Sequence, residues 1–286
     1  MKLFLKSLLV SSIALSASAF AAELSYKVYN PQTQAIFPVT STLITGEKDA
    51  VLVDAQFSVN DAKNLVKIIQ DSGKSLKYIV ITAGDPDYYF GLEPLVQAFP
   101  DAKVIATPEV VKHIQATKEG KFAYWGPILK SGAPSQIIVP NVIEDKSIEL
   151  EGERIEIKAP GKYASYLWVP SNRTILGGVG LSSGIHLWTA DTQSKEARDE
   201  WKKVLKQMNR LRPSAVIPGH YIGDIPTGTQ AIDFTYHYLA DVDKVLKDHK
   251  DSASVIAKLK EKYPNFADES SLELSSKVLT GEMEWK

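Results

Sequence analysis

The most informative stretch of the chain reads Ile81-Thr-Ala-Gly-Asp-Pro-Asp-Tyr-Tyr-Phe-Gly-Leu92, and it directly follows a hydrophobic, β-branched run. Such a run predicts a buried strand, and loops at strand ends are where α/β folds place their sites. Pro86 lies between Asp85 and Asp87, so both carboxylates are confined to one turn. At a separation of about 5 Å and an effective dielectric constant near 20, their repulsion would be about 3 kcal/mol. Either a cation offsets this repulsion or one carboxyl is protonated, unless one Asp caps the following helix and the other faces water.

On both sides of this stretch, short apolar runs alternate with amphipathic segments. The strand pattern recurs in the first half at 42–45, 50–54, 78–82 and 104–107, and in the second half at 147–150, 154–158, 166–169, 174–177 and 215–218. Helical spacing of apolar residues is found at 62–69, 95–99, 108–117, 201–211 and 232–246. Two halves, each with strands followed by helices, predict an α/β fold in which two sheets lie face to face with helices outside.

The N-terminal residues have the pattern of a secretory signal peptide. Lys2 and Lys6 precede an apolar core too short to span a bilayer, and Ala19-Phe20-Ala21 has the small-x-small pattern of a cleavage site. We therefore expect a signal peptide over 1–21 and a single domain over 22–286, whose residues from 252 onward form a helical extension. The expected location is the periplasm or the outside, with no stable membrane insertion after cleavage, because no apolar run continues after the signal.

Composition excludes several classes of protein. The 286 residues include 33 Lys+Arg, 34 Asp+Glu and no Cys. Without Cys there are no thiolate zinc sites, iron–sulfur clusters or Cys nucleophiles, so any metal must bind to His, Asp or Glu. A balanced charge without a basic block argues against nucleic acid as a partner. The expected partner is a small-molecule substrate or ligand.

Five segments together resemble the metallo-β-lactamase fold superfamily. They are Asp54 at the end of 51–54, the stretch 81–92, Pro160-Gly161, Thr174-Ile-Leu-Gly-Gly178 and Val216-Ile-Pro-Gly-His220. The resemblance implies a four-layer αββα sandwich with a one- or two-zinc site between the sheet edges. Members of that family hydrolyse lactams, thioesters, lactones and phosphoesters, so the fold does not name a substrate.

The metal-binding motif departs from the family pattern. In place of the family's His-x-His-x-Asp-His, this chain has Ala83, Asp85, Asp87 and Tyr88. The usual His after Pro160-Gly161 is replaced by Lys162, and the usual bridging Asp by Gly178. Asp87 and His220 alone keep their family residue, so a two-zinc site of the usual kind is not expected.

Two interpretations of this altered site remain open. In the first, Asp85, Asp87 and His220 hold one Zn²⁺ or Mn²⁺ ion whose bound water becomes the nucleophile. Tyr88 would then stabilise an oxyanion, and Asp54 would orient the metal-ligating side chains through contacts outside the metal's own coordination. In the second, the ammonium of Lys162 pairs with both aspartates and no metal binds.

Each interpretation implies a different class of protein. The metal site implies an exported hydrolase with a mononuclear centre that acts on a small ester-, lactone- or amide-like substrate. The site filled by Lys162 implies a non-catalytic binding or accessory protein that kept the fold after losing its metal.

Other residues are candidates for contacting a substrate. His186 and Trp188 follow the Gly178 segment closely enough to reach the same cleft, although His186 also fits a hydrogen-bonded core position. Trp125 belongs to an aromatic cluster with Phe122 and Tyr124 that either lines a substrate entrance or packs as a loop on the sheet. His113 is expected on a helix and belongs to no recognisable motif in the sequence.

Overall fold

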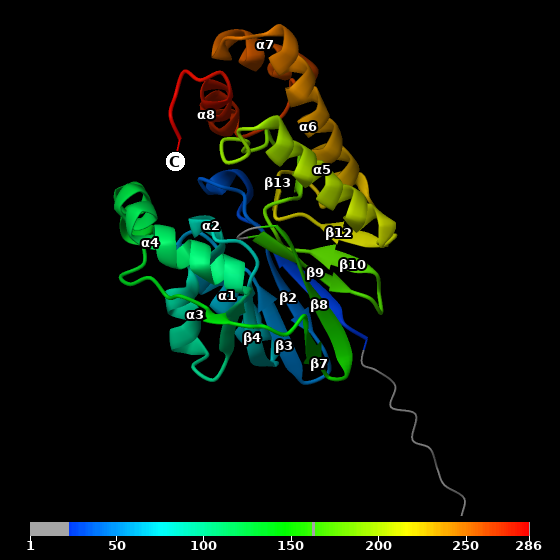
Figure 1. Cartoon of the computed structure of the whole chain (residues 1–286). Helices are drawn as coiled ribbons and strands as arrows, with labels where there is room; N and C mark the ends of the chain where they lie inside the picture. The colour runs from blue at the N-terminus through cyan, green and yellow to red at the C-terminus, as the bar shows by residue number, and fades with distance from the viewer. Residues whose placement is uncertain (1–22, 162–163, 286) are drawn as a thin grey trace, which may run out of the picture.

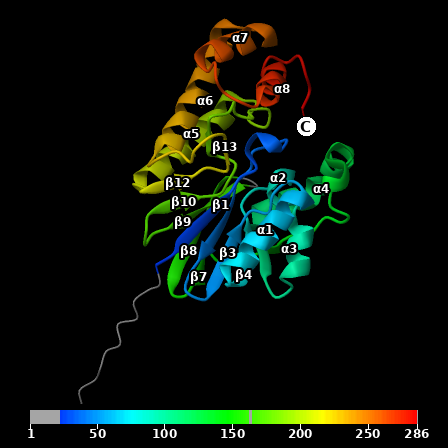
Figure 2. The same cartoon turned by 180° about the vertical axis from the view of Figure 1, so that it is seen from behind.

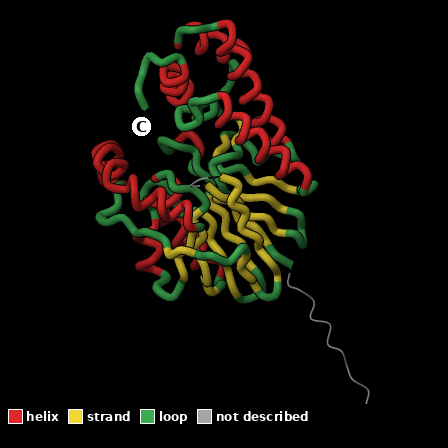
Figure 3. Tube along the Cα trace, in the orientation of Figure 1, coloured by secondary structure: helices red, strands yellow, loops and turns green. Residues whose placement is uncertain are grey.

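The computed structural model describes residues 23–161 and 164–285 (Figure 1). The expected signal peptide over 1–21 and Lys162 lie outside the described residues. Strands form two layers in the middle of the molecule, and helices lie on the outer side of each layer (Figure 3). This arrangement confirms the predicted αββα sandwich.

The first sheet is built from the N-terminal half of the chain. Its strands, in spatial order, are β1 (Ser25–Tyr29), β2 (Ser41–Thr45), β3 (Asp49–Val53), β4 (Ser75–Ile81), β5 (Lys103–Ala106) and β6 (Asn141–Val142). From β3 to β6 the neighbouring strands run parallel. The helices on its outer side are α1 (Val59–Ser72), α3 (Leu92–Ala98) and α4 (Pro108–Leu129), seen from both directions in Figures 1 and 2. The one-turn helix α2 (Pro86–Tyr89) follows β4.

The second sheet is built from the C-terminal half. Its strands, in spatial order, are β12 (Ala215–Ile217), β10 (Thr174–Leu176), β9 (Ala164–Val169), β8 (Glu153–Gly161) and β7 (Ser147–Leu150). Helices α5 (Lys195–Arg210), α6 (Gln230–Asp248), α7 (Ser252–Lys262) and α8 (Glu269–Leu279) lie on its outer side and beyond its end. A small third sheet pairs β11 (Ser182–Ser183) with β13 (His220–Tyr221).

Alternation along the strands explains the four layers. In β3, the side chains of Val51 and Val53 belong to the cluster between the two sheets, whereas those of Ala50 and Leu52 pack toward the helices. Successive side chains of a strand point to opposite faces, so a strand covered on both faces is apolar throughout. The run before Asp54 is apolar throughout because β3 is covered by the helices on one face and by the second sheet on the other.

Helix α4 is longer than the sequence pattern indicated. Thr107 caps its first turn, Pro108 occupies the first helical position, and the helix continues to Leu129 instead of ending near residue 117. The alternative in which Phe122, Tyr124 and Trp125 pack on the sheet as a loop is wrong in its conformation, because all three lie on this helix. Phe122 and Trp125 nevertheless pack against the core of the first sheet. None of the described helices is both long and apolar enough to span a bilayer.

Candidate functional site

The candidate residues gather where strands of both sheets end. Asp54 directly follows β3, Asp85 and Asp87 follow β4, and Gly178 follows β10. His220 comes three residues after the end of β12. β3 and β4 run parallel, so their carboxyl ends lie side by side at one edge of the first sheet. β10 and β12 are also parallel, so their carboxyl ends lie side by side in the second sheet. The loops that follow these strands therefore bring the candidate residues together.

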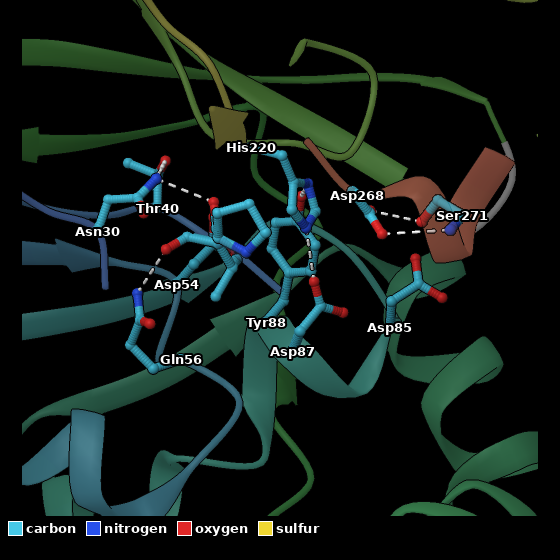
Figure 4. Close-up of polar contacts among 12 residues, drawn as sticks. Asn30, Thr40, Asp54, Gln56, Asp85, Asp87, Tyr88, His220, Asp268 and Ser271 are labelled. Carbon is cyan, nitrogen blue, oxygen red and sulfur yellow. Dashed lines mark hydrogen bonds and ion pairs between the residues drawn. The ribbon is translucent and has the colours of Figure 1, made fainter. Parts of the chain in front are cut away.

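A hydrogen-bonded triad of Asp87, His220 and Tyr88 lies at the centre of the site (Figure 4). The Nε2 atom of His220 lies 2.8 Å from Oδ2 of Asp87, and its Nδ1 atom lies 3.0 Å from the Tyr88 hydroxyl. Asp87 and Tyr88 are buried, and the His220 side chain is 13% exposed. Both ring nitrogens of His220 are therefore engaged by groups of the protein.

The Tyr88 hydroxyl acts as a proton donor in this triad. Burial, followed by the nearby charges of Asp87 and Asp54, raises the pKa of Tyr88 well above its ordinary value, so the phenol stays protonated. When Tyr88 donates to Nδ1 and the Nε2–H group of His220 donates to Asp87, all three groups are satisfied. Tyr88 thus positions the imidazole and presents no free hydroxyl to a substrate.

Asp54 lies fully buried behind the triad. Its two carboxylate oxygens accept hydrogen bonds from the backbone N–H group of Thr82 at 2.8 Å and from the Thr82 hydroxyl at 2.7 Å. Burial raises the pKa of Asp54 to about 7, opposed by the Thr82 hydrogen bonds and reinforced by the charge of Asp87. Asp54 therefore joins the ends of β3 and β4, and its protonation state changes near neutral pH.

Asp85 is turned away from the triad and pairs with a lysine that sequence analysis did not identify. The Nζ atom of Lys121, on α4, lies 3.0 Å from Oδ1 of Asp85, 3.1 Å from the carbonyl oxygen of Gly84 and 3.1 Å from Nε2 of His113. These three partners match the three donors of an ammonium group. Of the alternatives that the sequence leaves open, a cation that offsets the Asp85 charge is the one observed, and in the described part of the chain that cation is Lys121.

Lys121→Met should lower the free energy of unfolding by about 1–2 kcal/mol, because it leaves the half-buried Asp85 carboxylate and the Gly84 carbonyl without their donor. Urea unfolding at neutral pH measures this change. Lys118→Met is the matched control on the same helix, since Lys118 pairs with the exposed Glu119 and its loss should change stability by less than about 0.5 kcal/mol. Equal effects of the two substitutions would contradict the importance of the Asp85–Lys121 pair.

The residues at the family's metal positions do not fit a metal ion. Asp87 and His220 hold each other, and Asp85, the third expected ligand, holds Lys121. Gly178 has a φ of +84°, and a Cβ atom there would lie 2.5 Å from the carbonyl oxygen of Ser165, so no ligating side chain fits at this position. Within residues 23–161 and 164–285, no group of three His, Asp or Glu side chains could hold a metal ion.

The triad opens into a cavity of about 220 Å³ between the two halves of the molecule. The expected substrate-binding residues Trp125, His186 and Trp188 all line it. His186 also fulfils the core alternative, because it is buried and its Nδ1 atom lies 2.9 Å from the Tyr238 hydroxyl.

Several residues that line the cavity were not found from the sequence. They are His113 and Lys121 on α4, Trp201 on α5, and Asp191, Asp268 and Trp285 from the C-terminal half. The indole N–H groups of Trp188 and Trp285 donate to the two carboxylate oxygens of Asp191, at 2.6 and 2.8 Å. No local motif signals this contact, since Asp191 and Trp285 are separated by 94 residues.

Solved structures of metallo-β-lactamases are similar to this fold. The DIM-1 metallo-β-lactamase has a TM-score of 0.54 and 18% identity, over 76% of this chain and 93% of that protein. A metallo-β-lactamase from Pontibacter korlensis has a TM-score of 0.53 and 19% identity, over 76% of this chain and 93% of that protein. At such identities the likeness shows the fold alone.

Sequence comparison adds a partial relative and a family match. The uncharacterized protein YobT of Bacillus subtilis (strain 168) is 34% identical over 71 residues, which span 25% of this chain and 30% of that protein. The pattern of the family described as "Metallo-beta-lactamase superfamily" matches residues 35–220, more than half of the chain. This chain therefore belongs to the metallo-β-lactamase superfamily.

Proposed function

We propose that this protein is a metal-independent binding protein for a small organic molecule, which occupies the cavity beside the triad. The observation that carries the proposal is the engagement of both nitrogens of His220 by Asp87 and Tyr88. A metal ligand needs a free lone pair, and a general base needs a free nitrogen near its substrate. The described side chains at the family's metal positions use these atoms to bind each other.

The shape and lining of the cavity support a binding role. Ligand sites are concave and mostly apolar, with a few polar groups that orient the ligand. Here aromatic side chains such as Phe37 and Trp125 form much of the wall, and Asp87 and Lys121 add polar groups. The hydrogen bonds of the triad and of the Asp85–Lys121 pair hold these polar groups in place.

The competing function is the mononuclear hydrolase. It would require Asp85 to leave Lys121, and Asp87 to release His220, so that three ligand atoms converge on one ion. The superfamily supports hydrolysis as a class of reaction, whereas the geometry of these side chains favours binding.

Export forms part of the proposal on the strength of the sequence over 1–21. The mature chain recovered from a Gram-negative host should begin at or near Ala22, as intact-mass spectrometry would show. An uncleaved chain in the cytosol would contradict export and leave the binding function untouched.

Titration with the neutral apolar dye N-phenyl-1-naphthylamine tests binding. Protein treated with EDTA and dialysed should bind the dye saturably, and Trp125→Ala should weaken binding. Ile128→Ala is the matched control, because Ile128 lies on the same helix, is 45% exposed and does not line the cavity. Absence of saturable binding would overturn the proposal. Hydrolysis of ester, lactone or β-lactam probes that EDTA abolishes would establish the hydrolase instead.

A further inference from the structure

We infer that the cavity selects an organic cation, namely a small molecule carrying an alkylated ammonium group. This inference rests on the proposed binding function and adds the chemical class of the ligand. It is drawn from two independent features of the cavity, its tryptophan rings and its excess of carboxylates.

Tryptophan rings reach the cavity from both halves of the molecule. Trp125 comes from α4, Trp201 from α5, and Trp188 and Trp285 from the C-terminal half. The indole is the aromatic group that attracts cations most strongly, and rings gathered around a cavity are a recurrent means of binding alkylated ammonium groups. An apolar ligand without charge would gain only the burial of its surface from the same walls.

Hydrogen bonds hold three of these rings in place. Asp191 accepts from the indole N–H groups of both Trp188 and Trp285, and these rings meet edge to face with centroids 5.3 Å apart. The indole N–H group of Trp201 donates to the carbonyl oxygen of Gly180 at 2.9 Å. Because the rings are already ordered, a ligand loses less conformational entropy on binding.

The described lining of the cavity is also negatively charged. Four carboxylates contribute to it, those of Asp85, Asp87, Asp191 and Asp268. Figure 4 shows the Asp268 carboxylate accepting hydrogen bonds from Ser271 at the start of α8. Among the described lining residues, Lys121 is the one lysine. Its ammonium N–H groups are already engaged by Gly84, Asp85 and His113. Even with His220 protonated, four negative charges against two positive ones leave the described lining with a net charge of −2.

The other histidines do not offset this charge. Burial lowers the pKa of both His113 and His186, which favours their neutral forms. Asp87 is nine-tenths buried, and its Oδ1 atom has no hydrogen-bond partner among residues 23–161 and 164–285. A cation entering the cavity would supply a charge partner for this oxygen, and an anion would be repelled.

Three probes of one shape and different charge test the inference. They are choline, its neutral isostere 3,3-dimethylbutan-1-ol and the anion 3,3-dimethylbutanoate, each used to displace N-phenyl-1-naphthylamine at low ionic strength. Choline should bind at least about tenfold more tightly than the neutral isostere, and the anion more weakly than either. The preference for choline should decline as salt is added.

A pair of matched substitutions separates charge from structure. Asp268 caps α8 with a φ of +62°, and Asn both caps helices and tolerates this conformation, so Asp268→Asn removes the charge while keeping the cap. It should weaken choline binding by about threefold or more and leave the binding of the neutral isostere unchanged. Asp251→Asn makes the same change at the cap of α7, outside the cavity, and should change neither.

The outcomes distinguish the two proposals. If the dye binds saturably but choline displaces it no better than the neutral isostere, the ligand class is wrong and the binding function stands. If Asp268→Asn and Asp251→Asn weaken choline binding equally, the charge of the cavity is not the cause of the preference, and the inference fails. If the dye does not bind, the binding function itself fails.

Discussion

Replacing His220 with alanine should lower the free energy of unfolding by about 3–5 kcal/mol, even in protein freed of metal by EDTA. The substitution leaves the buried Asp87 carboxylate without its donor and the fully buried Tyr88 hydroxyl without its acceptor. An unpaired buried charge is costly because neither water nor protein compensates it. Urea unfolding in the presence of EDTA measures the loss.

Two further variants show whether the loss comes from the buried charge. His237→Ala removes an exposed histidine of α6, whose Nδ1 atom contacts the carbonyl oxygen of Asp233, and should change stability by less than about 0.5 kcal/mol. Combining Asp87→Asn with His220→Ala removes the orphaned charge and should recover part of the stability. A loss below about 1 kcal/mol for His220→Ala alone would show that the triad does not hold the site together.

Asp54 should make the protein less stable as the pH rises toward 8. Its pKa is about 7 in the folded protein, against an ordinary value of 3.8, so between these values the folded chain binds more protons than the unfolded chain. The contribution of Asp54 to stability is therefore fully present below about pH 4 and is lost as the pH rises through about 7. A shift of this size corresponds to on the order of 4 kcal/mol.

The comparison with Asp54→Asn isolates this contribution. Asparagine resembles the protonated carboxyl in shape and can still accept the hydrogen bond from the Thr82 backbone, so the variant should lack the decline in stability between pH 4 and 8. Unfolding free energies measured at several pH values in both proteins give the difference directly. Parallel pH profiles for the two proteins would contradict a raised pKa for Asp54.

The layers of the fold could be predicted from the sequence because strand and helix periodicities are local. The strand patterns at 147–150 and 166–169 agree with the observed bounds to within two residues, and Asp54 lies at the end of a strand, as its pattern predicts. The end of α4 was missed because no apolar periodicity marks its exposed second half, where Tyr124 and Ile128 face solvent. β1 was missed as well, since this edge strand of the first sheet is mostly half-buried and lacks a strong apolar run.

The site could be predicted only in part, because its contacts are long-range. Asp87 and His220 each follow the end of a strand and match the family pattern, which predicts that they lie close together. The structure brings them within hydrogen-bond distance. The pairing of Lys121 with Asp85 spans 36 residues and depends on the direction of α4 across the sheet. Nothing near Lys121 in the sequence specifies that direction, so the partner of Asp85 could not be identified in advance.

Titration of the chelator-treated protein with Zn²⁺ and, separately, Mn²⁺ tests most directly whether the site binds a metal ion. Both calorimetric binding and the melting temperature are followed. If Asp87, Tyr88 and His220 hold each other as the structure shows, neither ion should bind stoichiometrically or raise the melting temperature. A metal at a hundredfold excess over its Kd would add about 2.7 kcal/mol of stability, which is several degrees. Such a rise, abolished by His220→Ala, would contradict the metal-independent account and restore the mononuclear hydrolase.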